Sequence, residues 1–148
     1  MRKQRSSGVS REELERAAAF RLALRRFLAR TNEVSAGAGL TSQRYDLLLA
    51  LKTGEGEAST VGELVKTLSL PQPAVTELVK RAEEAGLIER SVGTDRRVSI
   101  LRLSREADER LMRAFVTLRE ERRQLAEAMR AVDASYRAFA RSQDDVAE

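Results

Sequence analysis

Both prolines of this 148-residue chain, Pro71 and Pro73, lie two positions apart, and they constrain the fold more than any other feature. Proline fixes φ and has no N–H, so it fits the first turn of a helix and disrupts a helix interior. We therefore expect one helix to end before Pro71 and the next to carry Pro73 in its opening turn. That second helix continues to Gly86, a residue suited to the left-handed conformation at a helix end. The pattern predicts a tight turn between two helices.

The helix expected after Pro71 has two different faces. Its apolar face consists of Val75, Leu78, Val79 and Ala82, and its polar face of Gln72, Thr76, Glu77, Lys80 and Arg81. A helix that follows a tight turn and presents Gln, Thr and Lys is how many proteins reach a DNA major groove. The same pattern fits an ordinary amphipathic helix in an α-helical hairpin, because periodicity determines packing and not partners.

The composition limits both the fold and the chemistry. The chain is 42% hydrophobic and only 4% aromatic, which favours a helix-packed core of Leu, Ala and Val. It contains no Cys and no His, which excludes disulfides, thiol switches and metal sites built on thiolate or imidazole. We expect a protein that is not an enzyme and needs no cofactor or metal. Because no segment reads as a signal peptide or a membrane span, we expect it in the cytoplasm.

Two capping boxes mark where helices begin. Ser10 with Glu13 predicts a first helix that ends near Asn32, and Thr60 with Glu63 predicts a short helix that ends before Ser69. Between them, a further helix is expected from about Thr41 to the glycines that follow Thr53. Residues 1–9 are basic, and we interpret them as a flexible arm that is either a solvated tail or a phosphate contact.

A β-hairpin is expected directly after Gly86. Residues 87–92 and 97–103 are rich in β-branched and apolar residues, and Gly93–Asp95 between them is typical of a turn. A hairpin behind a helix-turn-helix is a wing. Its tip carries Asp95, Arg96 and Arg97, and its flanks carry Arg90 and Arg102.

The C-terminal region reads as a long helix capped by Ser104. Its apolar residues alternate in steps of four and three, which is the heptad pattern of helices that associate side by side. The stripe consists of Leu111, Phe115, Leu118, Arg122, Leu125, Met129, Val132, Tyr136 and Phe139. This stripe is longer than one helix needs to cover a small domain, so we expect association between chains. Asp133 is a possible cap for a separate last helix.

Two stretches around the expected hairpin are informative: Glu84-Ala-Gly-Leu-Ile-Glu-Arg90 and Asp95-Arg-Arg-Val-Ser-Ile-Leu-Arg-Leu-Ser104. They resemble the MarR family of bacterial transcription regulators, and the second is similar to the family's wing motif with Ser104 in place of Thr. The resemblance covers about residues 11–145. It implies a mainly α fold, a winged helix-turn-helix with N- and C-terminal dimerisation helices and a two-stranded β-wing.

The resemblance also implies a function. Such proteins bind an inverted repeat in double-stranded DNA as homodimers, with a recognition helix in the major groove and a wing in the minor groove, and a small effector ligand commonly releases them. The implied division is a basic arm over 1–9, a dimerisation helix and loop over 10–40, a winged helix-turn-helix over 41–103 and dimerisation helices over 104–148. The dimerisation residues expected on this basis are Leu14, Leu24, Leu118, Leu125, Met129, Val132, Tyr136 and Phe139.

Contacts with DNA are expected from the recognition helix. Gln72 can pair with adenine, and Thr76 can bond to a base or touch a thymine methyl. Glu77 either accepts from a cytosine amino group or is a solvated charge offset by Lys80 or Arg81. Lys80 is expected to contact a backbone phosphate of the DNA. At the start of the preceding helix, Thr60 can bind phosphate together with backbone N–H groups.

Further contacts are expected from the wing. Arg97 matches the motif arginine and should enter the minor groove, where Asp95 would orient it by a charge-assisted pair. Arg96 is an alternative for the same role, and Arg90 lies on the flank. The other interpretation of this group is a solvated turn with a surface ion pair.

One departure from the family falls on Pro71 and Pro73, where many members have Ser or Thr. Fewer phosphate contacts are then available at the helix start, unless Gln72 supplies them. The net charge is +5 for residues 1–40, zero for 41–103 and −1 for 104–148, so DNA binding would need cations placed locally. The alternative is a winged-helix protein-interaction module that has lost DNA binding.

An effector pocket would lie between the dimerisation helices and the DNA-binding domain. Its candidate lining is Phe27, Tyr45, Leu48 and Phe115, residues that also fit a plain core.

Overall fold

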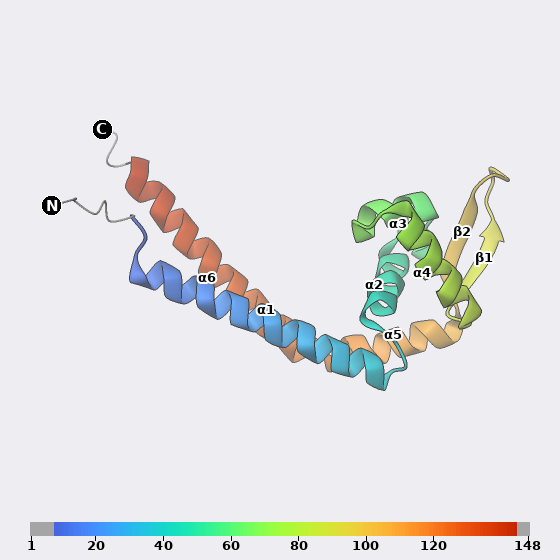
Figure 1. The fold of residues 1–148 in the computed structure, drawn as a ribbon, viewed down its shortest axis with the longest axis horizontal. Helices are drawn as coiled ribbons and strands as arrows, with labels where there is room; N and C mark the ends of the chain where they lie inside the picture. The colour runs from blue at the N-terminus through green and yellow to red at the C-terminus, as the bar shows by residue number, and fades with distance from the viewer. Residues whose placement is uncertain (1–7, 145–148) are drawn as a thin grey trace. The chain divides into compact units, whose positions relative to one another are not determined.

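The computed structural model describes residues 8–144, without the side chains of Tyr136, 139–140 and 142–144. The elements are α1 (Arg11–Gly37), α2 (Ser42–Thr53), the 3₁₀ helix η1 (Glu55–Glu57), α3 (Val61–Leu68), α4 (Gln72–Glu84), β1 (Ile88–Val92), β2 (Ser99–Leu103), α5 (Arg105–Thr117) and α6 (Arg119–Asp144) (Figure 1). The predicted mainly helical fold with a two-stranded wing is confirmed. Most of the expected basic arm, and the expected dimerisation side chains of Tyr136 and Phe139, lie outside the described residues.

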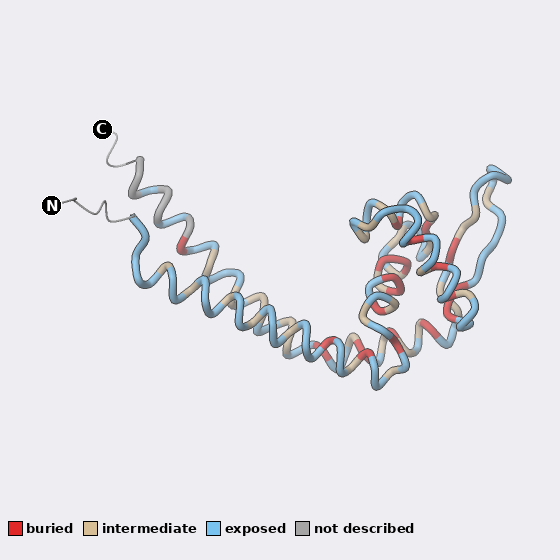
Figure 2. Tube along the Cα trace, viewed as in Figure 1, coloured by how far each residue is buried: buried red, intermediate tan, exposed pale blue. Residues whose placement is uncertain are grey.

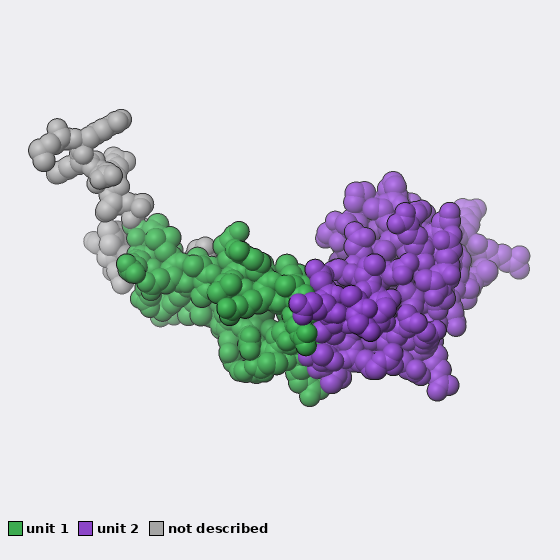
Figure 3. Space-filling view, turned by 60° about the horizontal axis from the view of Figure 1, so that its bottom comes forward, with its two compact units in different colours: residues 1–30, 118–148 green, residues 31–117 purple. Residues whose placement is uncertain are grey.

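The chain divides into two compact units, coloured separately in Figure 3. Residues 31–117 form one unit, and residues 1–30 together with 118–148 form the other. The unit of residues 31–117 extends at both ends beyond the winged domain expected over 41–103, and it includes α5, which packs against α2 and β2.

Most of the buried residues belong to the unit formed by residues 31–117 (Figure 2). α2 is its central element and contacts α3, α4, α5 and β2. The fully buried side chains come from every one of these elements and include Leu47, Leu51, Leu64, Val75, Val79, Leu101 and Leu111. Full burial of one such side chain contributes about 1.5–3 kcal/mol, so this leucine-rich core holds the helix-turn-helix and the base of the wing together.

The wing is an antiparallel pair in which Ile88 faces Leu103 and Val92 faces Ser99. Its second strand is joined to the segment before α3, because Ser59 N donates to Leu101 O at 3.0 Å and Leu101 N donates to Ser59 O at 2.8 Å. These two bonds connect the wing to the start of the helix-turn-helix by the backbone alone.

The expected end of the first helix is wrong by about one turn. α1 continues past Asn32 to Gly37, because Thr31 and Ser35, four residues apart, are buried on one face and hold this last part in the core. The chain turns at Gly39, whose φ is +73°, and Leu40 N donates to Ser35 O at 2.8 Å. The helix therefore ends at Gly37, and the left-handed residue that follows it is Gly39.

The expected single helix after Ser104, with a possible break at Asp133, is also wrong. The helix is interrupted at Leu118, and α6 passes through Asp133 without a break. Before the interruption, Thr117 Oγ1 donates to Arg113 O at 2.9 Å, a side-chain bond of the kind that bends helices. Asp133 pairs instead with Arg137, one turn further along, at 3.0 Å.

The unit of residues 1–30 and 118–148 has almost no core of its own. Only Leu118 and Ser135 are buried among its described residues. Its two long helices meet where Arg30 Nε lies 3.2 Å from Glu121 Oε1. Of the expected dimerisation residues, Leu125 and Val132 are half-buried, whereas Leu14, Leu24 and Met129 are exposed. No described helix carries an apolar stretch long enough to cross a membrane.

Candidate nucleic-acid interface

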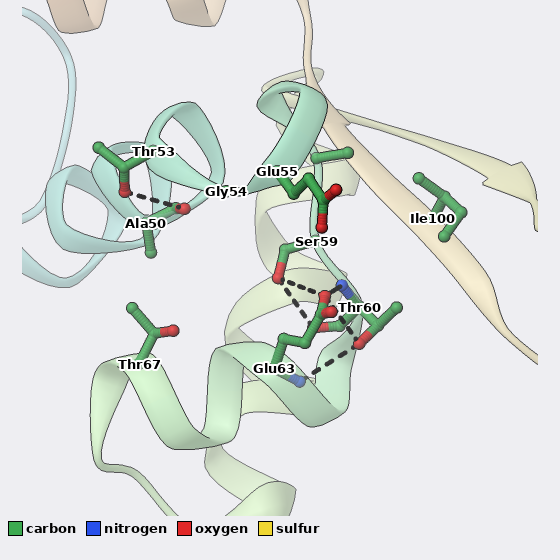
Figure 4. Close-up of a pocket in the computed structure, with 10 residues that line it drawn as sticks. Ala50, Thr53, Gly54, Glu55, Ser59, Thr60, Glu63, Thr67 and Ile100 are labelled. Atoms are coloured by element: carbon green, nitrogen blue, oxygen red, sulfur yellow. Dashed lines mark hydrogen bonds between the residues drawn. The ribbon is translucent and has the colours of Figure 1, made fainter.

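α3 begins with the capping box expected from the sequence. Thr60 Oγ1 accepts from Glu63 N at 3.2 Å, and Glu63 Oε2 accepts from Thr60 N at 2.8 Å (Figure 4). Ser59 Oγ also donates to Glu63 Oε2, at 3.1 Å. These hydrogen bonds lower the pKa of the Glu63 carboxyl below its usual value. The bond from the Thr60 backbone has the largest effect, and the bonds from the Ser59 and Thr60 hydroxyls add to it. A charged, well-bonded carboxylate therefore fixes the start of this helix.

This cap changes what Thr60 can do. Its hydroxyl faces Glu63 on the edge of a polar hollow of about 390 Å³ between α2, α3 and β2. A phosphate at this hydroxyl would have to displace the bond to Glu63 and approach its carboxylate. The predicted position of Thr60 at a helix start is therefore correct, but its side chain is already engaged.

α4 begins as the two prolines predict. Pro71 is its N-cap, with φ −60° and ψ 145°, and Pro73 lies in the first turn. The carbonyl of Pro71 accepts from Ala74 N at 3.0 Å and from Val75 N at 3.1 Å, so the missing proline donors leave the helix start bonded. Ser69, in the left-handed region at φ 53°, reverses the chain between α3 and α4. Gly86 ends α4 at φ +71°, as expected.

The outer face of α4 is accessible over its whole length. Gln72, Pro73, Thr76, Glu77 and Lys80 are exposed, while Val75 and Val79 are fully buried on the opposite side. Glu77 Oε1 accepts from Arg81 Nε at 2.7 Å, one turn along the helix. This pair supports the interpretation of Glu77 as an offset surface charge. Lys80 has no ion pair with any described residue.

The wing presents its arginines at an exposed tip. The turn spans 93–98, wider than the predicted 93–95, and it is closed by Gly93 N donating to Val98 O at 3.0 Å. Asp95 and Arg97 meet as predicted, but through the backbone and not through the guanidinium, because Asp95 Oδ1 accepts from the backbone N of Arg97 at 3.0 Å. The guanidinium groups of Arg96 and Arg97 have no ion pair within the described part of the chain.

Arg90, which the sequence suggested for contact with DNA, forms an ion pair within the chain. Its Nε and Nη2 donate to the two carboxylate oxygens of Glu83, each at 2.8 Å. The hydrogen bond to Arg90, with the attraction of its charge, lowers the pKa of Glu83 below its usual value. Because Glu83 lies in α4 and Arg90 in β1, the pair fixes the wing against the end of α4. This pair with Glu83 was not predicted from the sequence.

We expect Glu83→Gln to lower the free energy of unfolding by about 1 kcal/mol or less at neutral pH, the range of a partly exposed ion pair. The folded-state pKa of Glu83 is depressed, so its contribution is present above the unfolded pKa and is lost as pH falls through the folded value. Urea unfolding of both proteins at pH 7 and near pH 3 should show the difference shrinking in acid. Glu84→Gln, at an exposed neighbour, is the matched control and should behave like the original chain.

The four residues suggested for an effector pocket are divided between the two compact units. Tyr45 and Leu48 belong to α2 and are buried in the core, where Leu48 has no accessible surface. Phe115 is half-buried in the same unit, whereas Phe27 belongs to the other unit and lines a hollow of about 260 Å³ between α1 and α6. No cluster of three potential metal ligands occurs among residues whose placement is described.

Comparison with known proteins supports the resemblance seen in the sequence. Residues 38–98, from the end of α1 to the wing, match the model of the MarR family. The predicted resemblance to this family is therefore confirmed over the helix-turn-helix and most of the wing. No curated protein matches the chain.

Solved structures share the fold over nearly the whole length. AbsC, a MarR family transcriptional regulator from Streptomyces coelicolor, is 18% identical, with a TM-score of 0.68 over 95% of this chain and 99% of its own. YusO from Bacillus subtilis is 21% identical, with a TM-score of 0.62 over 91% of this chain and 99% of its own. A mutant MarR from E. coli complexed with operator DNA is 16% identical, with a TM-score of 0.66 over 90% of this chain and 99% of its own.

Proposed function

We propose that this chain, whose residues 38–98 match the MarR family, is a sequence-specific regulator of transcription that binds double-stranded DNA. The observation that carries the proposal is a juxtaposition within one compact unit. The exposed face of α4 and the arginine tip of the wing are held by the same core and by the Glu83–Arg90 pair. A helix and a basic hairpin fixed together in this way suit adjacent grooves of one duplex.

In this proposal each element has its own partner on DNA. α4 enters the major groove and presents Gln72 and Thr76 to base edges, while Lys80 meets phosphate. Arg97 enters the neighbouring minor groove, and Arg96 supports it from the same turn. The segment between 41 and 103 has no net charge, so these few cations supply the electrostatic attraction.

The active form in this proposal is a homodimer that binds an inverted repeat. The supporting observation is the unit of residues 1–30 and 118–148, which leaves leucines exposed and buries little within one chain. A partner copy that covers these side chains would supply the missing core and place two α4 helices on successive half-sites. We further propose that it acts as a repressor released by a small molecule, as the family resemblance suggests.

Binding to fragments selected from genomic DNA tests this function. If Lys80, Arg96 and Arg97 of both copies neutralise about six phosphates, affinity should fall about 10³-fold between roughly 50 and 200 mM salt. The measurement is fluorescence anisotropy over a salt series, with unrelated duplex as the control for specificity. An absence of binding at low salt would reject the proposal and favour a protein-interaction module.

A further inference from the structure

The leading surface of α4 has an unusual chemistry for a DNA-reading helix. Gln72, Pro73, Thr76 and Glu77 border a shallow hollow of about 460 Å³ on its exposed side. Pro73 offers an apolar ring with no N–H, and Thr76 offers a methyl group beside a hydroxyl that bonds to no described residue. The surface is therefore apolar at its centre and has an amide at its edge.

Groups that read guanine are missing from the border of this hollow. The usual partner of guanine is a free Arg or Lys, and none of the four bordering residues is either. Lys80, one turn beyond Thr76, is assigned to phosphate in the proposed function. Arg81, on the next turn, is held by Glu77 at 2.7 Å. That same bond uses Oε1 of the Glu77 carboxylate, so the charge that could accept from cytosine is already paired with an arginine. What remains is the Gln72 amide, which suits adenine, and an apolar contact, which suits the methyl group of thymine.

The spacing places the two apolar groups together. Pro73 and Thr76 are three residues apart, so they are neighbours on one side of the helix, while Val75 and Val79 point into the core. Lys80 follows Thr76 by one turn on the exposed side and can meet the DNA backbone beyond the hollow. The hollow thus faces a groove floor, and not the phosphates, when α4 lies in the major groove.

Resting on the proposed function, we propose that Pro73 and Thr76 form a reader of pyrimidine C5-methyl groups, so that the operator is recognised through thymine methyls. Pro73, which marks the start of α4, then also has a role in specificity, since its ring supplies an apolar contact and no donor. Removing one methyl from a well-packed contact should weaken binding about fourfold, and removing one from each half-site about fifteenfold.

Replacing thymine by uracil tests the proposal on the unaltered protein. Uracil keeps every base-pairing group and lacks only the C5 methyl, which lies in the major groove. Within the selected operator, one thymine per half-site should show the fifteenfold loss of affinity in anisotropy titrations. Uracil at the base pairs that the wing faces should have no effect, because the minor groove carries no methyl group.

Two variants show which side chains contact the methyl. In Thr76→Ser, which keeps the hydroxyl, and in Pro73→Ala, the penalty for uracil should shrink to less than about twofold. Thr67→Ser, which removes the same methyl from an exposed position of α3, should keep the full penalty. Tight specific binding with no penalty from uracil at any position overturns methyl reading and leaves the proposed function standing. A failure to bind any duplex overturns both.

Discussion

Leu14→Glu is expected to convert the protein to a monomer and to weaken operator binding by about 10²-fold or more. The Leu14 side chain is 61% exposed within one chain, so an acid there costs the isolated fold little. Glutamate is also as good a helix former as leucine. In the proposed dimer, however, the substitution buries an unpaired carboxylate against a partner copy. Loss of the dimer removes the gain from engaging two half-sites at once, which is typically 10²- to 10⁴-fold.

Light scattering after size exclusion and anisotropy on the selected operator measure the two effects. The matched control is Val92→Glu, the same kind of change at a wing position that is 73% exposed. The control should remain a dimer, although its acid near DNA will reduce affinity. A Leu14→Glu protein that stays dimeric would contradict the role proposed for this face of α1.

The parts of the fold that could be predicted are those set by a few neighbouring residues. The two prolines and Gly86 delimited α4, because each restricts the backbone at its own position. The Thr60–Glu63 capping box was visible because its two partners are three residues apart. Alternation and a turn sequence likewise indicated the wing.

The parts that could not be predicted depend on contacts between distant segments. α1 passes Asn32 because two small polar residues, Thr31 and Ser35, are buried in the core of the winged unit. Because both residues are polar, this part of the sequence resembles a loop. No repeating pattern of apolar residues indicates that the two side chains are buried. The break at Leu118 is similarly hidden, since Leu118 is a regular member of the heptad stripe. Asp133, which looks like a cap, is paired within a continuous helix.

The same reasoning applies to the candidate site. The exposed residues of α4 and the wing were identified because they are polar positions on elements with clear periodicity. Arg90 was assigned to DNA because an arginine on a hairpin flank reads as a surface cation. Its partner Glu83 is seven residues away, across the end of α4, and only the fold at Gly86 brings the two together. An acid at the end of one element and an arginine in the next is the signal that could have indicated this pair.

Arg97→Ala is expected to weaken operator binding about 10²-fold while leaving the dimer and the fold intact. Loss of an arginine that contacts a groove weakens binding by about 1–3 kcal/mol. Because the proposed dimer has two wings, a loss of about 1.4 kcal/mol at each wing, which is tenfold, gives the 10²-fold weakening. The guanidinium makes no ion pair with described residues, and the bond between Asp95 and Arg97 uses the backbone N, which alanine retains. The midpoint of thermal unfolding should therefore be unchanged, and only the DNA affinity measured by anisotropy should fall.

Two further variants distinguish a specific contact of Arg97 with the minor groove from a general electrostatic attraction to DNA. Arg97→Lys keeps the charge but loses the planar fork, and a narrow minor groove favours arginine, so this variant should recover only part of the affinity. Arg102→Ala removes the same charge from an exposed position of β2 outside the turn, and it should cost less than about threefold. Equal losses for Arg97→Ala and Arg102→Ala would mean that the wing attracts DNA only by its net charge. Affinity unchanged by Arg97→Ala would remove the wing from the interface and leave α4 as its only reader.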